Sequence, residues 1–256
     1  MRNLSSPARR LFYNVGFFGR TIKGVGAFIL RGQAARRILI MQILFTFVQA
    51  WGIFSLLAIG IGAAVNVIGI PFLARISQEQ LIYSLLISII TRELGPLLGA
   101  FIIIARSATA IATEIAGMVI SHEVEAYISI GVDPIEYLAV PRFLGVTISM
   151  FLLNVYFSLF GLVGSFVVAQ IFNAMPAEIY FDNLLQSLYF QDIFISIVKS
   201  IAFGMIISVV AITEGFSVER ASTEVPVAGL RAVSSAFAGC IVVDILLSAL
   251  YYMVLR

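Results

Sequence analysis

The sequence predicts an all-α integral membrane protein with one N-terminal amphipathic helix at the membrane interface, five transmembrane helices, and a short inner helix between the second and third spans. Three observations predict this class. Apolar residues make up 61% of the 256 residues and charged residues only 12%, whereas soluble domains are nearer half apolar and a quarter charged. The apolar residues form long uncharged runs rather than the alternating pattern of a β-barrel. Basic residues are concentrated before the first of these runs. A disordered chain and an ordinary soluble fold are therefore excluded.

Residues 1–37 predict a basic helix that lies in the membrane interface. No acid occurs before Glu79. Apolar residues recur every three or four positions, which places them on one helix face, and a basic helix of this kind is attracted to anionic lipid. The apolar stripe consists of Leu11, Val15, Phe18, Ile22, Val25 and Ile29. The basic residues are Arg2, Arg9, Arg10, Arg20, Lys23, Arg31, Arg36 and Arg37. A cleavable signal peptide fits poorly, because the first long apolar run begins only at Ile38.

The first two spans are predicted from residues 38–74 and 80–121. The first run carries no charge, and we expect its exit from the membrane at Asn66, Gly69 and Pro71. The second region is twice as long as a bilayer requires, but charges divide it into halves that are each too short to span. We therefore predict one long helix, kinked near Gly95-Pro96, that extends into the cytosol. The interrupting charges are Arg92, Glu93, Arg106 and Glu114.

The remaining spans are predicted at 143–177, 193–213 and 232–255. With the N-terminus inside, eleven Lys and Arg residues fall on the inner segments and two on the outer ones. Because basic residues favour the cytoplasmic side, we expect a cytoplasmic N-terminus and an outer C-terminus. We treat residues 1–256 as one domain, with the interfacial helix at 1–37 and the five-span bundle at 38–256.

Four charges inside the spans are the candidate site residues. Arg92 and Glu93 are either a structural ion pair that anchors the helix kink or a polar element that lines a substrate path, because a charge in hydrocarbon requires a partner or a wet cavity. Lys199 lies near the outer end of its span, where it either extends its amine to the interface or pairs with an acid. Asp244 lies in mid-span, and we hypothesise that Lys199 or Arg92 neutralises it.

The segment 122–134 carries acids on the predicted cytosolic side. We expect a helix that runs to Ile130, ends at Gly131 and turns at Asp133-Pro134. It is either an ordinary solvated loop helix or one that is buried against the bilayer surface or a soluble partner. Apolar residues favour the second interpretation, namely Val124, Tyr127, Ile128 and Ile130.

We expect no catalytic and no metal-binding residues, because the chain has neither a serine nucleophile elbow nor a histidine-rich metal set, and it cannot hydrolyse ATP by the usual phosphate-binding loop. That loop needs glycine directly before its lysine, but the two lysines, Lys23 and Lys199, follow Ile22 and Val198. His122 is the only histidine, so a metal site lacks ligands. We expect no cofactor in this chain, and any ATP and Mg²⁺ must be bound by a partner ATPase.

Several motifs resemble the MlaE/YrbE permease family, the membrane subunits of MCE-type lipid ABC transporters. The resemblance rests on Arg92-Glu93-Leu94-Gly95-Pro96-Leu97-Leu98, Arg106, Ala112-Thr113-Glu114-Ile115, Glu123-Val124-Glu125-Ala126, Gly131-Val132-Asp133-Pro134-Ile135-Glu136-Tyr137-Leu138 and Pro141-Arg142-Phe143. It covers nearly the whole chain. Ala108 and Ala116 stand where the family usually has glycine, but both residues remain small, so close helix packing should persist.

The resemblance implies a homodimer in the bacterial inner membrane, with a cytoplasmic N-terminus and a periplasmic C-terminus. Its implied partners are a cytosolic ABC ATPase, a periplasmic ring of MCE-domain proteins and, in many systems, a STAS-domain subunit; no nucleic acid is implied. The implied function is phospholipid movement between inner and outer membranes, which maintains outer-membrane lipid asymmetry. Arg92, Glu93, Lys199 and Asp244 would lie at the lipid cavity. The residues that would couple the chain to the ATPase are Glu123, Glu125, Tyr127, Gly131, Asp133 and Pro134.

Two other functions remain open from the residues themselves. A secondary transporter or channel could use Arg92, Glu93 and Asp244 as an ion relay, although the inverted repeats typical of such proteins are not evident. A structural anchor could hold the MCE ring and move nothing. ATP dependence would separate the first alternative from an ABC permease. The second predicts that neutralising Glu93 or Asp244 is harmless while deleting the chain is not.

Overall fold

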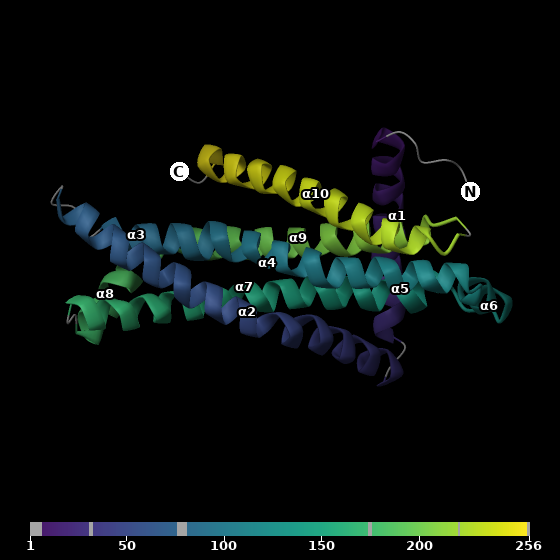
Figure 1. Cartoon of the computed structure of the whole chain (residues 1–256), viewed down its shortest axis with the longest axis horizontal. Helices are drawn as coiled ribbons and strands as arrows, with labels where there is room; N and C mark the ends of the chain where they lie inside the picture. The colour runs from purple at the N-terminus through teal and green to yellow at the C-terminus, as the bar shows by residue number, and fades with distance from the viewer. Residues whose placement is uncertain (1–6, 31–32, 76–80, 174–175, 220, 255–256) are drawn as a thin grey trace.

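A computed structural model describes residues 7–30, 33–75, 81–173, 176–219 and 221–254, and every regular element in these ranges is a helix (Figure 1). Five helices are long and apolar enough to cross a membrane. They are Arg37–Leu73, Leu81–Ile120, Ile135–Ile171, Phe190–Phe216 and Glu224–Met253. The predicted class, an all-α membrane protein with five spans, is confirmed.

The elements follow one another along the chain as a helical bundle with short helices at its two ends. The first two long helices and their neighbours are α1 (Pro7–Leu30), α2 (Gln33–Ala74), α3 (Leu81–Leu86), η1 (Ile87–Leu94), α4 (Gly95–Ile103), η2 (Ile104–Ala108) and α5 (Thr109–Ile120). The remainder are α6 (Glu123–Ser129), η3 (Ile135–Ala139), α7 (Val140–Asn173), α8 (Ala177–Ser187), α9 (Phe190–Phe216) and α10 (Glu224–Val254). Figure 1 shows α6 at one end of the bundle and α8 with the start of α3 at the other.

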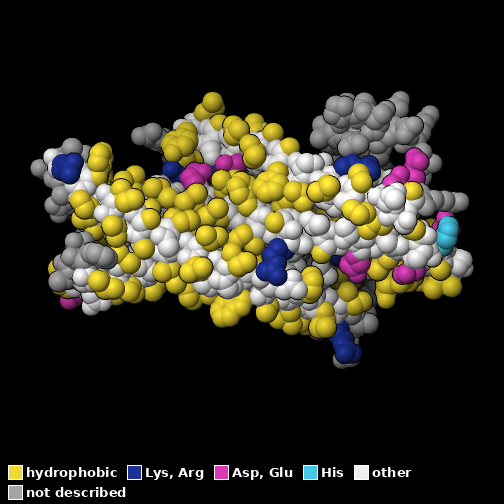
Figure 2. Space-filling model, in the orientation of Figure 1, with side chains coloured by type: hydrophobic (Ala, Val, Ile, Leu, Met, Phe, Trp, Pro, Cys, Tyr) yellow, Lys and Arg dark blue, Asp and Glu magenta, His cyan; other side chains and the backbone are white. Residues whose placement is uncertain are grey.

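The bundle is held together by close apolar packing around α9, the most buried of the five spans. Phe54 and Phe157 are fully buried with their rings 5.2 Å apart. A Cβ on Gly204 of α9 would lie 2.7 Å from Thr147 Cα, so α9 and α7 approach as closely as glycine permits. Outward-facing side chains are apolar as well, and Figure 2 shows hydrophobic atoms along the bundle, the histidine at the α6 end, and acidic side chains both near that end and in a group farther along the bundle. This distribution is that of a helix bundle whose sides face lipid.

The second span is one continuous helix, Leu81–Ile120, as predicted. Two stretches, η1 and η2, are π-helical. At the end of η1 the Gly95 N–H bonds to Ile90 O, five residues earlier. Pro96 follows and has no N–H, so the helix changes register at the position where the sequence predicts a kink.

Helix α2 continues past Asn66, Gly69 and Pro71, where we expect the first span to leave the membrane, and ends at Ala74. Asn66 is buried and its amide donates to Ser165 O at 2.6 Å, which fixes α2 against α7. Pro71 lies in the last turns of α2, where the loss of one backbone hydrogen bond is tolerated in membrane helices. The helix end agrees with the end of the uncharged run 38–74, and the exit from the membrane at these three residues stays a prediction.

Helix α1 crosses the direction of the long helices (Figure 1). Its buried face consists of Phe17, Thr21, Gly24 and Phe28. The predicted apolar stripe lies on a neighbouring face: Phe18 and Val25 are partly buried against the bundle, whereas Ile22 is 47% exposed. The side chains of Leu11, Val15 and Ile29, and those of Arg2, Arg9, Arg10, Arg31 and Arg36, lie outside the described residues.

Tyr180 helps to fix helix α8 at the end of the bundle opposite α6. Tyr180 is 1% exposed, and its hydroxyl bonds to Ser165 Oγ and to Leu162 O. Burial raises the pKa of Tyr180 to about 12, although the Ser165 hydrogen bond opposes this. The phenol therefore stays neutral at physiological pH and holds α8 against α7.

Candidate functional site

Lys199 is the centre of a charged cluster inside the bundle. Its side chain is fully buried, which excludes an amine extended to the interface. Nζ lies 2.5 Å from Glu93 Oε2 and donates to Ser248 Oγ at 2.8 Å. It also lies 2.9 Å from Asp244 Oδ1, as an ion pair without the geometry of a hydrogen bond. One ammonium therefore joins η1, α9 and α10.

Arg92 forms the second centre of the same cluster. Its Nε lies 3.2 Å from Glu93 Oε1 and its Nη1 lies 3.3 Å from Asp192 Oδ1. Nη2 donates to the Tyr252 hydroxyl at 2.9 Å. The guanidinium also lies over the rings of Tyr251 and Tyr252, 5.0 and 5.4 Å from their centroids, a distance at which a cation is attracted to an aromatic face. The hypothesised partner of Asp244 is thus Lys199, and Arg92 pairs elsewhere.

Asp192 completes the cluster, and sequence analysis missed it. The Tyr251 hydroxyl donates to Asp192 Oδ1 at 3.0 Å. A signal was present, because Asp192 precedes Lys199 by seven residues and therefore shares its helix face. Asp244, Ser248 and Tyr251 follow the same rule on α10. The cluster holds three carboxylates and two cations, so its formal charges leave an excess of one negative charge.

A buried hydrogen bond to the residue before Arg92 stabilises the π-helical hydrogen-bond register of η1. In a π-helical register Thr91 O would accept from residue 96, but Pro96 supplies no donor. Ser196 Oγ donates to Thr91 O at 2.6 Å instead, and the Asn154 amide donates to Ser196 Oγ at 2.8 Å. These bonds tie η1 to α9 and α7 one turn from the charges.

The cluster is only partly shielded from its surroundings. Glu93 keeps 34% of its side chain exposed, Asp244 20% and Arg92 12%, while Lys199 keeps none. On α10 the neighbouring outward residues are large and apolar, namely Ile245, Leu246, Leu250 and Met253. A charged group beside an open apolar surface can bind a molecule that has an ionic head and hydrocarbon tails.

The predicted coupling residues lie at the other end of the bundle (Figure 1). Glu123, Glu125 and Asp133 are exposed, and no residue of α6 is buried. Gly131 has a φ of +78°, which ends α6 as expected, and Asp133 Oδ1 accepts the Ile135 N–H at 2.8 Å. The Tyr127 ring lies 5.2 Å from that of Tyr137, and Pro134 begins the next helix. The structure places these six residues at one end of the bundle, away from the charged cluster (Figure 1).

A separate ion pair joins the second and third spans. Arg142 Nη2 lies 2.8 Å from Glu114 Oε1, and Nη1 donates to Leu138 O at 2.8 Å. Arg106, in mid-span, donates to Gln49 O and thereby ties η2 to α2. No three His, Cys, Asp or Glu side chains within the described ranges are arranged to hold a metal ion.

Comparison with known proteins decides the family. The sequence model described as Permease MlaE matches residues 39–250. The chain belongs to the MlaE permease family. With its five apolar helices, this MlaE-family permease is a multi-pass membrane protein.

Several known relatives carry related names. A probable ABC transporter permease protein of Rickettsia typhi is 32% identical over 56% of this chain and 55% of its own length, so the chain spans about half of that relative. The intermembrane phospholipid transport system permease protein MlaE of Haemophilus influenzae is 25% identical over 89% of this chain and 88% of that protein. The chloroplastic protein TRIGALACTOSYLDIACYLGLYCEROL 1 of Arabidopsis thaliana is 25% identical over 88% of this chain and 64% of that protein.

Proposed function

We propose that this permease is the membrane subunit of an ATP-driven transporter that moves phospholipid between the inner and outer membranes and maintains outer-membrane asymmetry. The proposal rests on the cluster around Lys199 and Arg92. In this cluster the lysine is fully buried, its two carboxylate partners are partly exposed, and exposed apolar side chains of α10 lie next to them. The Haemophilus relative, named for intermembrane phospholipid transport, supports the substrate class.

In the proposed mechanism, a lipid phosphate takes the place of one carboxylate on Arg92. Arg92 has two such partners at 3.2 and 3.3 Å, Glu93 and Asp192, and a phosphate accepts the same forked hydrogen bonds. Glu93 released in this way still pairs with Lys199. Because Arg92 contacts Glu93 on η1, Asp192 on α9 and Tyr252 on α10, a change in these contacts would favour a different arrangement of three spans, and ATP-driven closure could then expel the lipid.

The energy would come from a partner ATPase that binds ATP and Mg²⁺. The acidic surface of α6 is suited to this contact, because Ile128 on α6 and Ile130 directly after it are 60% and 72% exposed close to the acidic side chains. Exposed apolar residues rimmed by charge are typical of a protein interface. We place this surface in the cytoplasm and the C-terminus in the periplasm of a bacterial inner membrane. There a homodimer would enclose the lipid cavity and contact an MCE-domain protein, with a STAS-domain subunit in some assemblies.

Transport in proteoliposomes tests this proposal. The chain is reconstituted with its ATPase and MCE partners, and ATP-dependent transfer of labelled phospholipid is measured. Glu93→Trp should abolish transfer, because the indole ring would occupy the space proposed for the lipid headgroup. Ile68→Trp, at a site 71% exposed on α2, should leave transfer unchanged. Undiminished transfer by Glu93→Trp would show that the cavity assignment is wrong.

An ion relay is the second candidate, and one observation favours it. The contacts Asp192–Arg92, Arg92–Glu93, Glu93–Lys199 and Lys199–Asp244 form an unbroken chain of ion pairs. Such chains mark proton or ion pathways in other membrane proteins. A relay predicts movement driven by an ion gradient without ATP, so the same proteoliposomes separate the two functions.

A further inference from the structure

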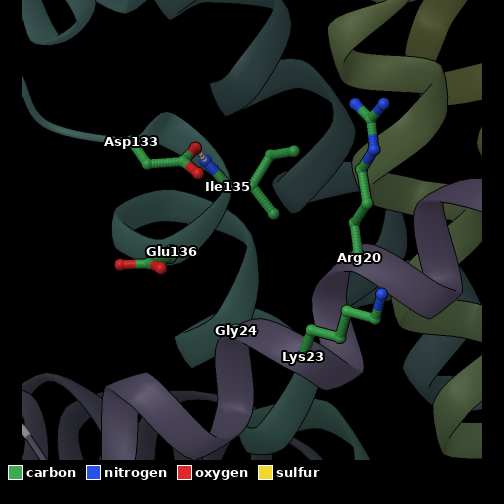
Figure 3. Close-up of a pocket in the computed structure, with 6 residues that line it drawn as sticks. All are labelled: Arg20, Lys23, Gly24, Asp133, Ile135 and Glu136. Carbon is green, nitrogen blue, oxygen red and sulfur yellow. Dashed lines mark hydrogen bonds between the residues drawn. The ribbon is translucent and has the colours of Figure 1, made fainter.

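A cleft distinct from the charged cluster lies where α1 meets the segment that follows α6. Its volume is about 360 Å³, within the roughly 300–1,000 Å³ of ligand sites. The lining residues are Arg20, Lys23, Gly24, Asp133, Ile135 and Glu136. Figure 3 shows the two cations on α1 across from the Asp133–Glu136 turn. Two segments far apart in the sequence thus form a basic and an acidic wall.

The basic wall is suited to a phosphate. Arg20 and Lys23 are three residues apart, so they lie on the same side of α1, and both are exposed. Within the described part of the chain neither forms a hydrogen bond or an ion pair. A phosphate could accept forked bonds from the guanidinium and a further bond from the ammonium.

The acidic wall is suited to a primary ammonium. Asp133 is exposed, and its Oδ1 accepts the Ile135 N–H at 2.8 Å, which leaves Oδ2 as an acceptor. Glu136, which has an interaction of its own, adds a second negative charge. A ligand with a phosphate alone would be repelled by this wall, and a quaternary ammonium could not donate a hydrogen bond to it.

The position of α1 identifies the source of the ligand. The helix crosses the direction of the spans (Figure 1), and Ile22, next to Lys23, is 47% exposed. A basic helix with an exposed apolar residue is typical of the lipid–water interface. We propose that the cleft binds the headgroup of a phosphoethanolamine lipid of the inner leaflet, with the phosphate on Arg20 and Lys23 and the ammonium on Asp133.

The proposed site would be regulatory and separate from the transport cavity. Asp133 follows Gly131, where α6 ends, and Ile135 begins η3. A headgroup that joins α1 to this turn would restrain the segment that holds α6. The composition of the inner leaflet would thereby influence the surface proposed to contact the ATPase.

Hydrogen–deuterium exchange of the unmodified chain in detergent tests the location of the site. The probes are short-chain phosphatidylethanolamine, phosphatidylglycerol and phosphatidylcholine, with soluble phosphoethanolamine and inorganic phosphate as competitors. Phosphatidylethanolamine should protect peptides that cover both 17–26 and 131–137, and the other two lipids should not protect 131–137. Protection of 17–26 alone would indicate a non-specific basic helix and overturn the proposal. If either soluble competitor displaced phosphatidylethanolamine, the conclusion that the ligand is a membrane lipid would be wrong.

Variants then test the two walls separately, with binding measured by native mass spectrometry in the absence of the ATPase. Asp133→Asn keeps an oxygen for the Ile135 N–H but removes the charge, so affinity for phosphatidylethanolamine should fall roughly tenfold or more while affinity for phosphatidylglycerol does not fall. Arg20→Ala combined with Lys23→Ala should lower the affinity for both phosphatidylethanolamine and phosphatidylglycerol. Arg37→Ala, which removes an exposed cation of α2, should leave the affinity for both lipids unchanged. Unchanged selectivity in Asp133→Asn would contradict the proposal.

Discussion

Lys199 and Asp244 form an ion pair across two spans, with Nζ 2.9 Å from Oδ1. Lys199 is fully buried while Asp244 keeps 20% of its side chain exposed, so only the carboxylate of this pair is accessible from outside the bundle. Glu93, on a third helix, approaches the same ammonium at 2.5 Å. Two carboxylates on one cation make the position of each carboxylate depend on the other.

Removing the shared cation should destabilise the bundle more than removing one acid. Lys199→Met leaves Glu93 and Asp244 without their common partner, and breaking a buried pair in this way costs about 3–5 kcal/mol. That range is an upper bound here, since both acids are partly exposed. Adding Asp244→Asn to Lys199→Met should recover part of the loss, measured by thermal unfolding in detergent. Strictly additive effects would show that the two residues are not coupled.

Ser196→Ala should destabilise the chain by about 1–3 kcal/mol, because Thr91 O loses its donor in a buried site. Ser200→Ala is the matched control, since its Oγ bonds only to Ile197 O in its own helix. In a Pro96→Ala background the residue at 96 gains an N–H, so Ser196→Ala should cost less there. An equal cost in both backgrounds would contradict the register argument.

Gly204→Ala should weaken packing between α9 and α7. The added Cβ would lie 2.7 Å from Thr147 Cα and 3.2 Å from Met150 Cβ, and overpacking of this kind costs about 1–3 kcal/mol. Gly117→Ala, where the Cβ meets nothing within 4 Å, should be neutral or stabilising by up to about 1 kcal/mol. The unfolding midpoints of the two variants are compared. Equal midpoints would show that α9 does not approach α7 at Gly204 as closely as described.

Ile128→Asp should reduce the amount of ATPase that copurifies with the chain. The substitution adds a charge to a side chain that is 60% exposed on α6, and a charge buried at an interface without a partner is unfavourable. Ala221→Asp, in the exposed loop before α10, adds the same charge elsewhere and should have no effect. If both variants retain the ATPase equally, α6 is not the contact.

The sequence predicted the five spans and singled out four of the five charged residues that the structure brings together, but it did not single out the fifth, Asp192. Uncharged runs identify the spans because each must cross hydrocarbon, and Lys199 with Asp244 stood out because charges there need partners. Asp192 was missed because it lies near the start of α9, where an acid is unremarkable. Only the packing of α9 against η1 shows that it meets Arg92.

Mild-detergent purification of the tagged chain, with mass spectrometry of its bound proteins and lipids, tests the central claim most directly. We predict that an ABC ATPase and an MCE-domain protein copurify, and that phospholipid is retained by the unmodified chain and by Ile68→Trp but lost from Glu93→Trp. A chain that purifies without an ATPase, or that holds the same phospholipid after Glu93→Trp, would contradict the account.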